Sequence, residues 1–117
     1  MLWTIIVTVL CLVDLSKVNT QNSISIPNLD KIVHLVFYTL MTFLWGISLL
    51  KPSSSIFPKS VALIASCIIF GIIIEILQGF GGFNRSFEWK DILANTTGVF
   101  LGYIICLKIL KFKPHIK

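Results

Sequence analysis

The sequence predicts an all-α integral membrane bundle of four transmembrane helices, and its composition and hydropathy pattern carry this prediction. Of the 117 residues, 56% are hydrophobic and 13% are charged, whereas soluble domains contain about 25% charged residues. The mean hydropathy is +0.91. The apolar residues form four stretches separated by polar segments, and helices satisfy their own backbone hydrogen bonds inside a bilayer. We therefore expect residues 1–117 to form a single membrane domain.

The four predicted spans are not equally strong. We place them at about residues 1–18, 31–50, 60–80 and 91–110. The first is the weakest, because it reaches residue 18 only by including Asp14 and Lys17. Even then it covers about 27 Å of a hydrocarbon core of about 30 Å. A cleaved signal peptide is the alternative, but no positive segment precedes Leu2 and no small-x-small cleavage motif follows.

Prolines mark the boundaries of the second and third spans. Pro27 disfavours helix at the residue before it, so the second span should begin near residues 28–30, where Asn28 or Asp30 can cap it. Residues 52–58, with a proline at each end, read as a short turn before the third span.

The distribution of Lys and Arg predicts a bacterial cytoplasmic-membrane protein with both termini in the cytoplasm. One end of the bundle should carry Lys51, Lys59, Lys108, Lys111, Lys113 and Lys117, and the other Lys17, Lys31, Arg85 and Lys90. Cytoplasmic loops are richer in positive residues, so the end with six should face the cytoplasm.

Charge and cysteine content exclude several function classes. The net charge is +5, but the basic residues stand singly and form no face interleaved with aromatics, so we expect no nucleic-acid partner. Cys11, Cys67 and Cys106 lie inside apolar stretches and read as packing residues, not as a disulfide framework. Neither a Cys-x-x-Cys nor a His-Glu-x-x-His motif occurs. We expect no cofactor, and the lipid bilayer is the expected partner.

Polar and small residues recur at helical spacing inside three of the spans, so that each set shares one helix face. The sets are Asp30, His34 and Tyr38 in the second span, Gly71, Glu75 and Gln78 in the third, and Asp91, Asn95, Gly98 and Gly102 in the fourth. A carboxylate facing lipid at the bilayer centre costs roughly 2.5 to 3.5 kcal/mol on insertion scales. These faces should therefore meet protein or a wet cavity.

A short loop between the third and fourth spans brings their polar ends to the same membrane surface. We therefore predict an outward-facing polar pocket made by spans two to four. Its predicted members are Asp30, His34, Tyr38, Glu75, Gln78, Arg85, Asp91 and Asn95. Gly71, Gly98 and Gly102 are predicted helix-packing positions, because small residues let helix backbones approach closely in a membrane.

Structural and functional interpretations of this pocket both stay open. Glu75 is either half of a structural ion pair with Arg85 or Lys90, or a carboxylate that faces a ligand. Histidine has an unperturbed pKa of about 6.5, so His34 is either a hydrogen-bonded structural residue or a general base. His34 and Glu75 are thus the catalytic candidates. A metal site from His34, Glu75 and Asp91 would have mixed ligands but no spacing signature, and none is predicted.

The same residues carry a resemblance to a known family. The pattern is Asp30-Lys31-x-x-His34-x-x-x-Tyr38, then Gly71-x-x-x-Glu75-x-x-Gln78, then Arg85-Ser86-Phe87-Glu88-x-x-Asp91-x-x-Ala94-Asn95-x-x-Gly98-x-x-x-Gly102. Over about residues 30–102 it is similar to the VanZ-like family of small bacterial membrane proteins. The resemblance implies a cytoplasmic-membrane protein, and the family's namesake is linked to low-level resistance to the glycopeptide teicoplanin.

These observations favour a non-catalytic role in the cell envelope, namely binding or modulating an outer-leaflet lipid, a cell-wall precursor or a glycopeptide antibiotic. The main alternative is a small intramembrane enzyme acting on a phospholipid or lipid-linked phosphate, with Glu75 or His34 as general base and Arg85 holding the anion. A proton-coupled carrier is the third, and it is disfavoured because the polar residues gather at one surface instead of the midplane.

Overall fold

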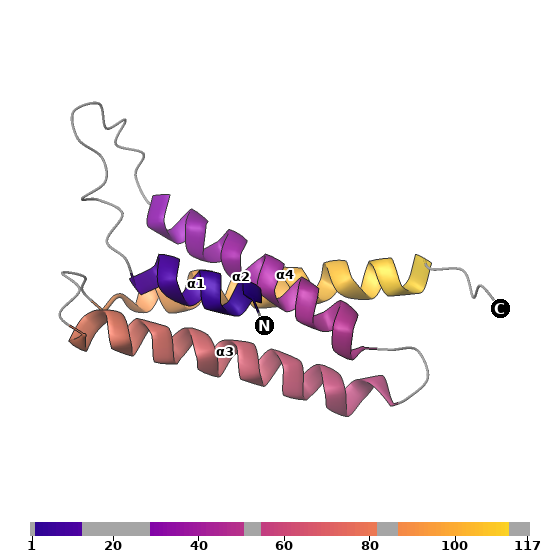
Figure 1. The fold of residues 1–117 in the computed structure, drawn as a ribbon. Helices are drawn as coiled ribbons and strands as arrows, with labels where there is room; N and C mark the ends of the chain where they lie inside the picture. The colour runs from indigo at the N-terminus through magenta and orange to yellow at the C-terminus, as the bar shows by residue number, and fades with distance from the viewer. Residues whose placement is uncertain (1, 13–28, 51–54, 82–86, 113–117) are drawn as a thin grey trace.

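The computed structural model describes residues 2–12, 29–50, 55–81 and 87–112. These residues form four α-helices and no strand, which confirms the predicted all-α class (Figure 1). The helices are α1 (Leu2–Leu12), α2 (Leu29–Leu49), α3 (Ile56–Phe80) and α4 (Trp89–Phe112).

Three of the helices are long and apolar enough to cross a membrane. The candidate spans are Leu29–Leu49, Ile56–Phe80 and Trp89–Lys111, and each is about 30 Å or longer at 1.5 Å per residue. Helix α1 has 11 residues and covers about 16 Å, roughly half of the hydrocarbon core. The structure therefore supports three of the four predicted spans. The rest of the predicted first span, residues 13–18, lies outside the described residues.

The predicted turn at residues 52–58 is partly wrong. Ile56, Phe57 and Pro58 already form the first turn of α3. Proline is accepted there because the N–H that it lacks would have no acceptor within the helix. The start of α2 at Leu29 agrees with the predicted start near residues 28–30.

Helices α2 and α4 run in the same direction and form the most extensive helix pair, whereas α3 runs antiparallel to both (Figure 1). At one end, Lys31 of α2 lies 3.6 Å from Asp91 of α4. Near the other end, Gly46 of α2 lies against both Cys106 of α4 and Leu63 of α3. The polar ends of the three long helices therefore lie together.

Glycines allow α2 and α4 to pack at this close distance. A Cβ atom added at Gly98 would lie 2.5 Å from the carbonyl oxygen of Leu35 and 3.1 Å from the Cβ of Tyr38. One added at Gly102 would overlap the carbonyl oxygen of Thr39. The carbonyl oxygens of Leu35 and Thr39 are backbone atoms of α2. A side chain at Gly98 or Gly102 therefore fits only if the two helices move apart.

Helix α1 packs against α2 and α3 through hydrogen bonds as well as apolar contacts. The indole N–H of Trp3 donates to the carbonyl of Phe37 at 3.3 Å. The indole N–H of Trp45 donates to the hydroxyl of Thr4 at 3.0 Å. These bonds tie α1 to α2, and the Cys11 side chain of α1 is buried.

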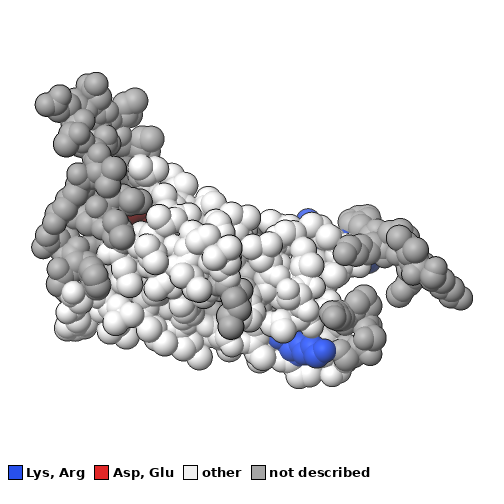
Figure 2. Space-filling view, viewed as in Figure 1, with Lys and Arg blue, Asp and Glu red and all other residues white. Residues whose placement is uncertain are grey.

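The bundle has an apolar exterior, and its interior contains buried polar residues beside an apolar core. Large apolar side chains such as Leu44, Ile73 and Ile104 are exposed. The buried polar residues are His34, Thr42, Ser60, Glu75, Gln78, Asp91 and Asn95. Figure 2 shows a face that is almost free of charge, with Lys and Arg gathered toward one end. This distribution suits a bundle surrounded by lipid.

Candidate functional site

Three helices bring a buried polar group together near their common end. We call this group the inner cluster: His34 of α2, Glu75 of α3, and Asp91 and Asn95 of α4. None of the four exposes more than 5% of its surface. The Nδ1 atom of His34 lies 2.9 Å from Asn95 Oδ1 and 3.9 Å from Glu75 Oε1. One nitrogen or oxygen atom from each of His34, Glu75 and Asp91 falls within 4.8 Å of the other two.

A second, partly exposed group covers the inner cluster. We call Asp30, Lys31 and Glu88 the outer layer. The ammonium group of Lys31 lies 2.9 Å from Glu88 Oε2, 3.4 Å from Asp30 Oδ2 and 3.6 Å from Asp91 Oδ1. The side chains of Asp30 and Glu88 are 38% and 44% exposed. Lys31 thus connects the surface carboxylates to the buried Asp91.

The start of α4 links the two groups. The backbone N–H of Glu88 donates to Glu75 Oε2 at 3.4 Å, and the N–H of Asp91 donates to the carbonyl of Glu88 at 3.0 Å. The first N–H groups of a helix have no acceptors within it. The Glu75 carboxylate therefore binds the backbone just before α4 as well as lying beside His34.

Gln78 and Tyr38 take positions beside the inner cluster. The Gln78 side-chain amide donates to the backbone carbonyl of Cys11 in α1. The Tyr38 ring is nearly parallel to the His34 ring, with centroids 6.5 Å apart. Its buried hydroxyl has no hydrogen-bond partner among the described residues. Gln78 thus binds α1, and Tyr38 is buried one helical turn after His34 in α2.

The predicted pocket residues therefore fall into separate roles. The structure brings together His34, Glu75, Asp91 and Asn95, and it places Asp30 in the outer layer. Arg85 lies outside the described residues, so its predicted pairing with Glu75 stays a prediction. The three predicted glycines all lie in buried helix contacts, Gly71 against Tyr38 and Asn95 and the other two against α2.

Lys31 and Glu88 were not among the predicted pocket residues. A signal for both was present, because Lys31 directly follows Asp30 and Glu88 stands three residues before Asp91. Each therefore lies within one helical turn of a predicted pocket residue. Their meeting across 57 positions of sequence depends on how α2 and α4 pack.

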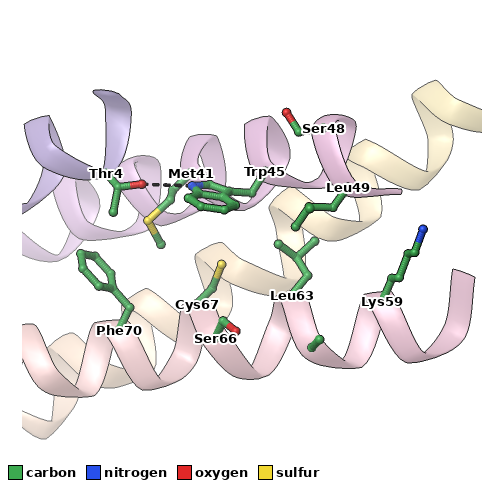
Figure 3. Close-up of a pocket in the computed structure, with 11 residues that line it drawn as sticks. Thr4, Met41, Trp45, Ser48, Leu49, Lys59, Leu63, Ser66, Cys67 and Phe70 are labelled. Carbon is green, nitrogen blue, oxygen red and sulfur yellow. Dashed lines mark hydrogen bonds between the residues drawn. The ribbon is translucent and has the colours of Figure 1, made fainter. Parts of the chain in front are cut away.

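A separate apolar cavity of about 600 Å³ lies between α2 and α3 (Figure 3). Trp45 and Met41 of α2 and Phe70 of α3 form much of its wall, Thr4 of α1 borders it, and Lys59 stands at one end. No residue of the inner cluster or outer layer lines it. It is therefore distinct from the polar site.

Comparison with known proteins agrees with the resemblance seen in the sequence. A family model described as VanZ/LLP1 matches residues 3–111. The match confirms the likeness over residues 30–102 and extends it to α1 and nearly all of α4. No curated protein and no solved structure matches the chain.

Proposed function

The chain belongs to the VanZ/LLP1 family, and from this premise we propose that it binds an outer-leaflet lipid, a cell-wall precursor or a glycopeptide antibiotic in the cell envelope. The proposed binding site is the outer layer with the inner cluster beneath it. In this proposal the protein lies in the bacterial cytoplasmic membrane with both termini in the cytoplasm. The site then faces outward, where such ligands are found.

The observation that carries the proposal is the position of the site. It lies at one end of three helices long enough to cross a membrane, so its depth is that of lipid headgroups. Asp30 and Glu88 are partly exposed there, whereas Glu75 is buried beneath them. A ligand at the membrane surface can therefore reach the outer layer without leaving the headgroup region.

The charge of the site favours a ligand with an amino group. Four of the chain's five acidic residues belong to the two groups, namely Asp30, Glu75, Glu88 and Asp91. Lys31 is the cation among them, and its ammonium group lies within 3.6 Å of three of these carboxylates. Complementary charge promotes association and selects partners. The Lys31 contacts thus illustrate how a ligand amine can be held.

Binding can be tested on the purified protein in detergent. Native mass spectrometry would detect co-purified lipid, and titration with phosphatidylethanolamine or teicoplanin would measure affinity. We expect Asp30→Asn combined with Glu88→Gln to weaken binding of an amine ligand. The control is Lys108→Gln, an exposed residue toward the other end of α4, which should bind as the wild type does. Binding that is absent in the wild type, or equal in all three proteins, would refute the proposed site.

The geometry of His34 supports the intramembrane enzyme as a second candidate. A base needs a partner that orients it, and Asn95 and Glu75 both lie beside the His34 imidazole. Turnover of a labelled lipid-linked phosphate that disappears in His34→Gln would favour this alternative. We rank it second because His34 is only 1% exposed, and a general base must come within hydrogen-bond reach of its substrate.

A further inference from the structure

We propose that His34, Glu75 and Asp91 form a binding site for one divalent transition-metal ion. The ion would bind within the inner cluster. The inference goes beyond the proposed function, because it holds whichever ligand the outer layer binds. It also departs from the sequence analysis, which predicted no metal because the three residues show no ligand spacing.

The distances between the candidate ligand atoms carry the proposal. One atom from each of the three side chains lies within 4.8 Å of the other two, and His34 Nδ1 lies 3.9 Å from Glu75 Oε1. Tetrahedral ligands bound to zinc at 2.0 to 2.1 Å are about 3.3 Å apart. Small side-chain rotations therefore suffice to close the group around an ion. Each ligand comes from a different helix, so the ion would join α2, α3 and α4.

Burial and charge provide a second reason. Asp91 is 5% exposed, and its Oδ1 atom accepts no hydrogen bond from the described residues. Glu75, fully buried, points its carboxylate at the same space. Burying two carboxylates is costly unless they are paired or bind a metal. The Lys31 ammonium lies 3.6 Å from Asp91 Oδ1 but is shared with Asp30 and Glu88. A divalent cation would supply further positive charge between Glu75 and Asp91, since neutral histidine adds none.

The inner cluster is a better site for the ion than the outer layer, because a lysine already lies among the outer carboxylates. Asp30, Glu88 and Asp91 also lie close enough together to hold a cation. However, the ammonium group of Lys31 already lies among these three carboxylates. The inner group instead contains an imidazole, which binds transition metals in preference to Mg²⁺ or Ca²⁺. Asp91 belongs to both groups, so the exposed Asp30 and Glu88 offer a path from the surface to the buried ligands.

The ligand set indicates the kind of metal. One imidazole and two carboxylates suit Zn²⁺ or Mn²⁺, and zinc is the stronger binder in the usual order of divalent affinities. Three protein ligands leave a fourth position open for water or an incoming group, as in catalytic zinc sites. Asn95 Oδ1 lies 2.9 Å from the same Nδ1 atom of His34, so an ion bound through Nδ1 would replace this hydrogen bond.

The experiment measures zinc binding by the full-length protein in detergent. The protein is stripped with a chelator, titrated with ZnCl₂ in a calorimeter, and analysed for metal content after dialysis. We expect one zinc ion per chain. His34→Gln, Glu75→Gln and Asp91→Asn should each raise the Kd at least about 100-fold, because losing even a residue that supports a ligand typically costs 10- to 100-fold.

The matched control is Cys106→Ser, which changes a buried potential ligand of α4 that lies outside both groups. It should bind zinc as the wild type does. Thermal midpoints without zinc verify that each variant is folded, and if one ligand variant fails to fold, the other two decide the question.

Three outcomes would overturn the metal site: no zinc binding by the folded wild type, unchanged affinity in the folded ligand variants, or an equal loss in the folded Cys106→Ser variant. The last would show that the loss is not specific to the three ligands. Failure here is distinguishable from failure of the proposed function. Ligand binding that persists in the chelator-treated protein, without zinc binding, would refute only the metal site.

Discussion

At the scale of single residues, the contact between His34 and Asn95 determines how the imidazole is held. The two side chains lie 2.9 Å apart and both are almost fully buried. His34 stands four residues after Asp30 in α2, and Asn95 stands four residues after Asp91 in α4. The two helices run side by side in the same direction. The parallel packing therefore places the two similar motifs next to each other.

We predict that Asn95→Leu destabilises the protein by about 1 to 3 kcal/mol, because it leaves a buried ring nitrogen of His34 without its partner. Chemical unfolding in detergent would measure the change. The control is Thr97→Ala, whose exposed hydroxyl donates only to Leu93 of its own helix, and this variant should remain within about 0.5 kcal/mol of the wild type. Equal effects of both variants would contradict the structural role of Asn95.

The ion pair between Lys31 and Glu88 should contribute much less to stability. Its side chains are 21% and 44% exposed, and partly exposed pairs typically contribute about 0.2 to 1 kcal/mol. We expect Glu88→Gln to lower the free energy of unfolding by no more than this amount, and less at high salt, where charges are screened. A loss as large as that of Asn95→Leu would show that the outer layer is structural.

At the scale of helices, the glycines of α4 set the distance between α2 and α4. The obstacles to a side chain at Gly98 include the Leu35 carbonyl oxygen, which cannot move without its helix. At Gly71, by contrast, the nearest atoms belong to the side chains of Tyr38 and Asn95, at 3.1 and 3.3 Å. A methyl group at Gly71 can therefore be accommodated by side-chain movement, whereas one at Gly98 requires α2 itself to move.

We predict that Gly98→Ala lowers the thermal midpoint in detergent and that Gly71→Ala lowers it less. Overpacking typically costs about 1 to 3 kcal/mol, which exceeds the gain of up to about 1 kcal/mol that alanine brings to a helix interior. A midpoint that is unchanged or raised in Gly98→Ala would show that α2 and α4 are not in close contact at this position.

A second prediction at this scale concerns the attachment of α1. Removing the bond from Gln78 to the Cys11 carbonyl by Gln78→Leu should loosen the end of α1 and expose the Cys11 thiol more often. A net hydrogen bond contributes about 0.5 to 1.5 kcal/mol, so Cys11 should react with a thiol reagent about 2- to 12-fold faster. Cys67, which is buried in α3, serves as the internal control and should keep its rate. Faster labelling of both would indicate general destabilisation instead.

At the scale of the whole molecule, orientation decides which side of the membrane the polar site faces. In the described residues, Lys59, Lys108 and Lys111 lie at the end opposite the site, and Lys31 and Lys90 lie at the site's end. Positive residues favour the cytoplasm. This supports the proposed outward-facing site, although both ends carry basic residues.

We predict that Asn84→Cys reacts with an impermeant thiol reagent added outside the cell and that Ser54→Cys does not. Each is made in a background in which Cys11, Cys67 and Cys106 are replaced by alanine. Position 84 lies between α3 and α4 in the sequence and position 54 between α2 and α3, and both are outside the described residues. Labelling of Ser54→Cys alone would reverse the orientation and place the polar site on the cytoplasmic side.

The sequence by itself determined the all-α class, the approximate limits of α2, α3 and α4, and the membership of the VanZ/LLP1 family. These features depend on local information, namely long apolar stretches, helical spacing of polar residues and a family motif. The limits failed where local signals are ambiguous. Pro58 read as part of a turn, although a proline also suits the first turn of a helix. For the first span, the structure describes a helix over Leu2–Leu12, and residues 13–18 lie outside the described residues.

Only the tertiary structure decided which polar residues meet. The spacing of Glu75 and Gln78 placed both on one face of α3, but Glu75 lies beside His34 whereas Gln78 binds α1. Lys31 lies between the carboxylates of Asp30 in α2 and Asp91 in α4. Helical periodicity specifies the face of a residue but not the rotation and axial shift of one helix against another. Here close packing at Gly98 and Gly102 sets the approach of α2 and α4, and with it the contacts between them.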